Sequence, residues 1–152
     1  MLLYKNITAF RTIAMENILD HIDVPPVHKT LGGEVLAWAK EIEQLTMQYQ
    51  AIPEFLNPAG NLQGGMLCAM IDDAMGLFSL LINQDQFSVT VGLNISYLRP
   101  CKLGDVCVKI ETVKNGKKII NMIGHAYQNG HCVAQATSVF MPIETQTAIG
   151  RK

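Results

Sequence analysis

The sequence has no excess of charge of either sign. Of its 152 residues, 12 are Lys or Arg and 13 are Asp or Glu, so the formal net charge is −1. Proteins that bind nucleic acids or anionic membranes through charge carry a basic excess. The sequence therefore predicts no nucleic-acid partner and no membrane partner. Hydrophobic residues make up 49 % and charged residues 16 %, which indicates one folded domain over residues 1–152 with apolar surface hidden in an oligomer.

The sequence also lacks paired cysteines. None of its four cysteines has CxxC spacing or lies in a His-rich cluster; they are Cys68, Cys101, Cys107 and Cys132. This pattern is not that of a zinc or redox motif. A chain of this length forms a core without disulfides. We expect reduced thiols, no metal site, no cofactor and a cytoplasmic location.

No long uninterrupted apolar run is present. Residues 1–22 mix apolar and polar side chains, without the apolar stretch and cleavage site of a secretory signal. The longest apolar run, residues 66–82, carries Asp72 and Asp73 in its middle. Because charged side chains are costly inside a bilayer, we expect this run to be a core helix, not a membrane span.

The first half of the chain predicts two helices and two strands. Apolar residues at helical spacing predict a helix over residues 6–22, which Pro25-Pro26 end. Residues 33–40 and 44–51 are typical of two strands joined by a charged turn, although residues 41–44 could also continue a helix. Residues 64–83 predict a helix that is apolar nearly all round, and therefore buried on most faces.

The second half predicts strands. Apolar and polar residues alternate over residues 89–97, which indicates a strand with one apolar face. Three further strands are expected over 106–112, 119–127 and 132–141, the last two joined through Asn129-Gly130. Asn115-Gly116 is a second two-residue hairpin signal. The result is an α+β fold, an antiparallel sheet curled around helix 64–83, whose open edge calls for a homodimer or homotetramer.

Two features of helix 64–83 point to chemistry. Gly64-Gly65 open the helix, where bare backbone N–H groups and the helix dipole favour a developing oxyanion, although glycines also simply make a flexible helix start. Asp72 and Asp73 are carboxylates in an apolar helix, and neighbours on a helix diverge by about 100°. At least one carboxylate should therefore belong to a site or to a hydrogen-bonded interface.

These residues follow a known spacing. Asn57 lies six residues before Gln63-Gly64-Gly65, and Asp72 lies nine residues after Gln63. The strand turn contains Leu98-Arg99-Pro100 followed by Gly104-Asp105. From about residue 31 to 143 the chain resembles hotdog-fold acyl-CoA thioesterases of the phenylacetate-pathway type. The resemblance implies a central helix wrapped by an antiparallel sheet, to which helix 6–22 is an N-terminal addition.

The resemblance also implies roles for single residues. Asp72 is the catalytic carboxylate, either as general base on a water or as nucleophile on the thioester. The Gly64 N–H polarises the thioester carbonyl, and Gly65 allows close packing. Asn57 orients the carbonyl or the water, and the Thr90 hydroxyl helps to hold that water. In this family the active site is shared across a dimer, with Asp72 facing Gly64 of the other subunit.

One position departs from the family pattern. Gln63 stands where the family has His, and Gln forms hydrogen bonds but does not titrate near neutral pH. Because Asp72 is present, the resemblance favours hydrolysis of an acyl-CoA, with coenzyme A as part of the substrate. Gln63 keeps open a non-catalytic protein that binds acyl-CoA or an acyl carrier. A hydratase or dehydratase of the same fold and a purely structural protein stay open as well. Asp73 matches no catalytic position and is expected at a helix interface.

Overall fold

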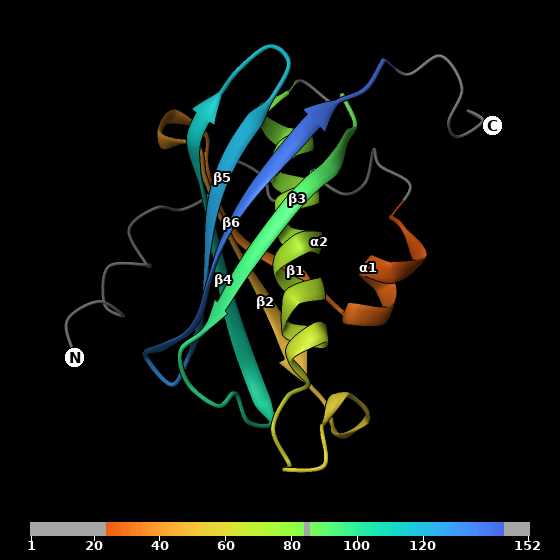
Figure 1. Cartoon of the computed structure of the whole chain (residues 1–152), viewed down its shortest axis with the longest axis vertical. Helices are drawn as coiled ribbons and strands as arrows, with labels where there is room; N and C mark the ends of the chain where they lie inside the picture. The colour runs from red at the N-terminus through yellow and green to blue at the C-terminus, as the bar shows by residue number, and fades with distance from the viewer. Residues whose placement is uncertain (1–23, 84–85, 145–152) are drawn as a thin grey trace.

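The computed structural model describes residues 24–83 and 86–144, so the helix expected over residues 6–22 lies outside the described residues. A six-stranded antiparallel sheet in the order β1-β2-β4-β5-β6-β3 curls around the long helix α2 (Figure 1). The strands are β1 Glu34–Ala39, β2 Gln44–Ala51, β3 Ser88–Tyr97, β4 Gly104–Asn115, β5 Ile120–Gln128 and β6 His131–Pro142. The helices are α1 Pro26–Leu31 and α2 Gly64–Ile82, and two short 3-10 turns are η3 Lys40–Ile42 and η4 Pro53–Phe55. The predicted architecture of a sheet around a central helix is confirmed.

A short helix begins where the sequence predicted only a break. Pro26 is in the first turn of α1, and Gly32 closes the helix with φ 67°. The sequence analysis predicted a break at Pro25-Pro26 but no helix after it, so α1 was missed. Proline is tolerated in the first helical turn, where its missing N–H has no partner to lose.

The first strand pair agrees with the prediction. β1 and β2 form an antiparallel pair whose connection contains η3 and then Glu43 in the left-handed conformation, with φ 45°. The alternative of a continuing α-helix over residues 41–44 is thereby excluded.

Strands β4, β5 and β6 form the expected meander, but only one of the two predicted turns is tight. Asn129 and Gly130 both have positive φ, 50° and 78°, as a two-residue hairpin requires. At Asn115-Gly116 the prediction was wrong, because the connection runs over residues 116–119. There the Gly116 N–H donates to the Ile119 carbonyl oxygen at 3.0 Å.

Strand β3 is an edge strand that pairs with β6, not with the next strand in the chain. A bulge between Thr90 and Gly92 shifts its register. The single apolar face predicted for this strand is only partly found, since Val91 is 62 % exposed and Tyr97 51 % exposed. β3 therefore combines a free backbone edge with exposed apolar side chains.

Helix α2 is buried along one face. Its core residues recur at helical spacing; they are Leu67, Met70, Ile71, Ala74, Met75 and Phe78. The opposite side, which includes Cys68, Asp72 and Gly76, is only partly covered. The prediction of burial on most faces is therefore met only in part by a single chain, in which one face is buried and the others are partly covered. α2 is also long and apolar enough to suit a membrane span, but its most apolar face packs against the sheet.

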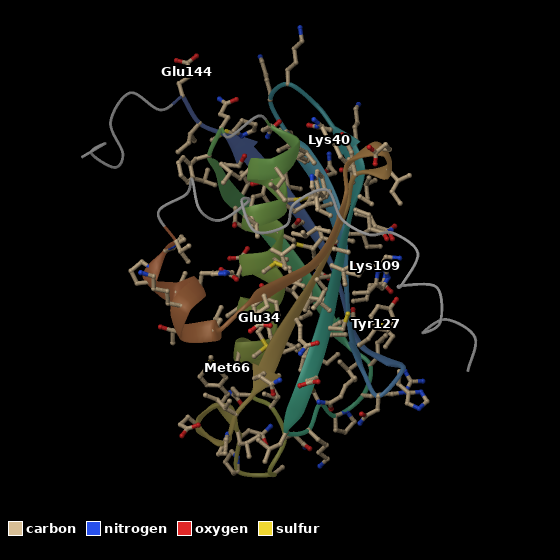
Figure 2. All side chains as sticks on the ribbon, turned by 180° about the vertical axis from the view of Figure 1, so that it is seen from behind. Glu34, Lys40, Met66, Lys109, Tyr127 and Glu144 are labelled. Atoms are coloured by element: carbon tan, nitrogen blue, oxygen red, sulfur yellow. The ribbon has the colours of Figure 1, made fainter. Side chains whose placement is uncertain are left out.

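The outer face of the sheet is more polar. Figure 2 shows Lys109 and Tyr127 on the side of the sheet away from α2. A shallow hollow on this outer face is lined by residues that include Asn94, Asn121 and Thr137. It contains none of the predicted site residues, so the candidate site lies on the other side of the sheet.

Candidate active site

Asp72 and Thr90 meet between α2 and the edge strand β3. The Thr90 hydroxyl donates to Asp72 Oδ1 at 2.9 Å. Asp72 is half-buried on α2, and Thr90 is exposed on β3. The structure thus brings together two residues that are far apart in the sequence, and it leaves Asp72 Oδ2 without a hydrogen-bond partner among the described residues.

The first turn of α2 presents free backbone donors. Gln63 is the N-cap and forms no side-chain capping bond. Its carbonyl oxygen accepts from the N–H groups of Met66 at 2.9 Å and Leu67 at 3.1 Å. Within the described part of the chain, neither Gly64 nor Gly65 donates its N–H to an acceptor. Donors of this kind at a helix N-terminus favour an anion.

Tyr97 covers the start of α2. Its hydroxyl donates to the Gly64 carbonyl oxygen at 2.7 Å. A Cβ on Gly64 would lie 3.0 Å from Tyr97 Cζ, whereas a Cβ on Gly65 would meet no atom within 4 Å. Tyr97 was not among the site residues predicted from the sequence. Its position near the helix depends on the pairing of β3 at the sheet edge, which no local pattern reveals.

The loop before α2 uses part of Asn57. The side-chain oxygen of Asn57 accepts from the N–H groups of Ala59 at 2.9 Å and Asn61 at 3.2 Å. This oxygen therefore shapes the loop, and only the Asn57 side-chain amide nitrogen is available to a substrate. The Gln63 side chain is exposed at the same end of the helix.

Gly64 and Asp72 are eight residues apart on α2, so they are separated by about 12 Å along the helix axis. Cys68 lies midway between them. Burial, and secondarily the charge of Asp72, raises the pKa of the Cys68 thiol, which keeps it protonated at neutral pH. One chain therefore does not place Asp72 and Gly64 around a single carbonyl group.

Asp73 lies in a cluster that was not predicted from the sequence. Its Oδ2 is 2.7 Å from His28 Nδ1 and accepts from the Tyr49 hydroxyl at 2.8 Å. The three side chains come from α1, β2 and α2, and His28 is 7 % exposed. The hydrogen bond that His28 donates to Asp73 raises the pKa of His28, while burial raises the pKa of Tyr49. Asp73 is thus a helix-interface residue, as expected, and the His28 partner was missed because α1 was not predicted.

Metal ligands do not cluster in residues 24–83 and 86–144, where no group of three or more His, Cys, Asp or Glu side chains is placed to hold an ion. All four cysteines are free thiols. The chemistry available at the site therefore comes from a carboxylate, a hydroxyl, amides and backbone N–H groups.

Comparisons with known proteins agree with this fold. A family model described as the thioesterase superfamily matches residues 59–131. A phenylacetic acid degradation-related protein from Ralstonia eutropha JMP134 is 36 % identical, with a TM-score of 0.78 over 82 % of this chain and 95 % of that chain. A Streptococcus mutans UA159 protein bound to acetyl CoA, 22 % identical, shares the fold with a TM-score of 0.67 over 73 % of this chain and 88 % of that chain.

Human acyl-coenzyme A thioesterase 13 is 31 % identical over 67 residues, which are 43 % of this chain and 48 % of the human protein. The match thus spans about half the length of that curated relative. The fold, the Ralstonia relative and the family match lead to one conclusion: the chain has the hotdog fold and belongs to the thioesterase superfamily.

Proposed function

We propose that this protein hydrolyses an acyl-CoA thioester to a carboxylic acid and free coenzyme A. The observation that carries the proposal is the Asp72 carboxylate, held by Thr90 at 2.9 Å on a helix whose first N–H groups are free. The human relative is named for action on acyl-coenzyme A, and the Streptococcus fold neighbour holds acetyl CoA. These names support coenzyme A as the carrier of the acyl group.

The proposed chemistry uses the two oxygens of Asp72 differently. Thr90 donates to Oδ1, so Oδ2 can take a proton from an attacking water. The water oxygen bonds to the thioester carbon, and the carbonyl oxygen becomes an oxyanion that accepts from the Gly64 N–H. The C–S bond then breaks, and the proton on Asp72 passes to the departing thiolate. Direct attack of Oδ2 on the carbonyl, followed by hydrolysis of the anhydride, uses the same groups.

The active site is proposed to be shared between two copies of the chain. Both groups must be within about 3 Å of the reacting atoms, but they are about 12 Å apart along one helix. A two-fold related copy brings Gly64 of one chain to Asp72 of the other. The exposed residues of β3, such as Val91 at 62 %, and the partly covered side of α2 are available to contact that copy.

Asn57 and Gln63 are proposed to contact the thioester through amide groups. The Asn57 amide nitrogen is free to donate, because its oxygen is used within the loop. Gln63 stands next to Gly64 at the entrance to α2 and supplies a hydrogen bond without a titrating proton.

The proposal is tested by thiol release from acetyl-, hexanoyl- and phenylacetyl-CoA. We expect the wild type to release thiol from at least one compound. Asp72→Asn removes the base and should lower kcat at least about 100-fold while the oligomeric state and acyl-CoA binding persist. Glu41→Gln, the same change of a carboxylate on the exposed turn η3, should leave kcat unchanged.

A second candidate function has one observation in its favour. Gln63 stands at the helix start where the family has a titrating His, so a protein that binds acyl-CoA without cleaving it is the alternative. Binding of the three compounds by calorimetry with no thiol release would establish it. An Asp72→Asn variant with full turnover would refute the proposed mechanism.

A further inference from the structure

We propose that the Gly65 N–H is a second oxyanion donor and that Tyr97 is the positioning residue that orients and strengthens it. This inference rests on the proposed function, because it concerns the same thioester carbonyl. It assigns a role to the Gly65 N–H and to the Tyr97 side chain, to which the family resemblance assigns no such role.

One peptide group links Tyr97 to the Gly65 N–H. The carbonyl oxygen of Gly64 and the N–H of Gly65 belong to the same planar unit and point in opposite directions. The Tyr97 hydroxyl donates to that oxygen at 2.7 Å. Gly64 and Gly65 are in α2, so helical geometry sets the plane of this peptide, and the Tyr97 hydrogen bond further restrains it and hence the direction of the Gly65 N–H. Because linked hydrogen bonds polarise one another, it also makes the Gly65 N–H a stronger donor.

The preceding peptide group is held in a similar way by the helix itself. Its oxygen, that of Gln63, accepts from the N–H groups of Met66 and Leu67 at 2.9 and 3.1 Å. The N–H of this same peptide group is that of Gly64. The N–H groups of Gly64 and Gly65 are therefore both restrained, because the carbonyl oxygen of each one's peptide group accepts a hydrogen bond. Neither N–H donates to an acceptor within the described residues.

The two glycines differ in what surrounds them. The space of a Cβ on Gly64 is filled by Tyr97, whose Cζ and hydroxyl oxygen would lie 3.0 and 3.1 Å away. No atom lies within 4 Å of a Cβ position on Gly65, and Gly65 is exposed. Within the chain, then, Gly64 is the glycine needed for packing, and Gly65 leaves room for a ligand. This differs from the close-packing role that the resemblance implies for Gly65.

Tyr97 can be changed without disturbing the core. It is 51 % exposed at the end of the edge strand β3. Tyr97→Phe keeps the ring over Gly64 and removes only the hydroxyl. We expect kcat to fall about tenfold, less than for loss of a whole oxyanion donor, with KM changed less than about twofold. The matched control is Tyr127→Phe on the outer face of the sheet, which should leave both constants unchanged.

Gly65→Ala separates stability from activity. The added methyl group meets no protein atom and alanine favours the helix, so the melting temperature should stay the same or rise. The methyl group does obstruct a carbonyl oxygen approaching the N–H, and kcat should fall about 100-fold.

A measurement without turnover distinguishes this inference from the proposed function. Ketone analogues of the three acyl-CoAs, with a methylene group in place of the thioester sulfur, can bind but cannot be hydrolysed. In wild type, binding should shift the Gly65 amide proton downfield in the NMR spectrum, and the shift should be smaller in Tyr97→Phe. This result supports the inference even if wild type releases no thiol and the proposed hydrolysis fails. An unmoved Gly65 amide, or full kcat in Tyr97→Phe of an active enzyme, would overturn it.

Discussion

At the scale of single residues, two adjacent carboxylates have opposite environments. Neighbours on a helix diverge by about 100°, so Asp73 faces α1 and β2 while Asp72 faces the edge strand. Asp73 accepts from both His28 and Tyr49, whereas Asp72 accepts from Thr90 alone among the described residues. Both oxygens of a carboxylate can accept hydrogen bonds, so Asp73, with two close donors, is held in the helix interface, whereas one oxygen of Asp72 can accept a proton from a substrate or water.

The His28–Asp73 pair predicts a pH-dependent stability. The pKa of His28 is raised above its ordinary value of 6.5, so folding favours the protonated imidazole. Its contribution is complete below about pH 6.5 and is lost as the pH rises through the raised folded-state pKa. His28→Gln keeps a donor but cannot titrate. The difference in free energy of unfolding between wild type and His28→Gln should therefore be larger at about pH 6 than at about pH 9, by urea denaturation.

His131 provides the control for that experiment. It is exposed at the start of β6. The difference between wild type and His131→Gln should be small and nearly the same at both pH values. A His28→Gln difference that stays constant or grows toward the higher pH would show that the charged pair does not stabilise the fold.

At the scale of elements, the junction of α1 and β1 is packed around the Asp73 cluster. A Cβ on Gly33 would lie 2.7 Å from Tyr49 Cε1 and 2.9 Å from His28 Cε1. Both rings are held by Asp73 and cannot move away without lengthening those hydrogen bonds. Gly33→Ala should lower the free energy of unfolding by about 1–3 kcal/mol, measured by chemical denaturation.

Gly92 in β3 is the comparison for Gly33. A Cβ there would meet no atom within 4 Å. Gly92→Ala should change the free energy of unfolding by less than about 0.5 kcal/mol. Equal effects at the two glycines would contradict the packing explanation.

At the scale of the whole molecule, a shared active site predicts complementation. Asp72→Asn lacks the carboxylate, and Gly64→Val lacks a correctly placed helix start, because its side chain collides with Tyr97. Each variant should be inactive alone. After joint refolding in equal amounts, random pairing should restore roughly a quarter of the sites, since half of the dimers are mixed and each mixed dimer has one intact site. The measurement is thiol release before and after joint refolding.

If joint refolding restores no activity, the active site is not shared between two chains. If each chain contained a complete active site, every site in the mixture would lack one group and no activity would return. Refolding each variant by itself controls for recovery caused by the procedure.

The sequence by itself determined the sheet, the central helix and the spacing of Asn57, Gly64 and Asp72, because periodicity, turn residues and motif spacing are local properties. Helix α1 was missed because proline signals both the end and the first turn of a helix, and local sequence does not distinguish them. The partly covered face of α2 was missed because a helix that is apolar nearly all round does not reveal which of its sides packs against the sheet.

Only the tertiary structure decided which residues meet. Thr90 reaches Asp72, and Tyr97 reaches Gly64, because β3 crosses to the sheet edge beside β6 and lies along α2. His28 and Tyr49 reach Asp73 because α1 folds back on α2 and β2 lies under both. These contacts join residues 18 to 45 positions apart, and long-range contacts depend on strand order and packing, which no local pattern in the chain encodes.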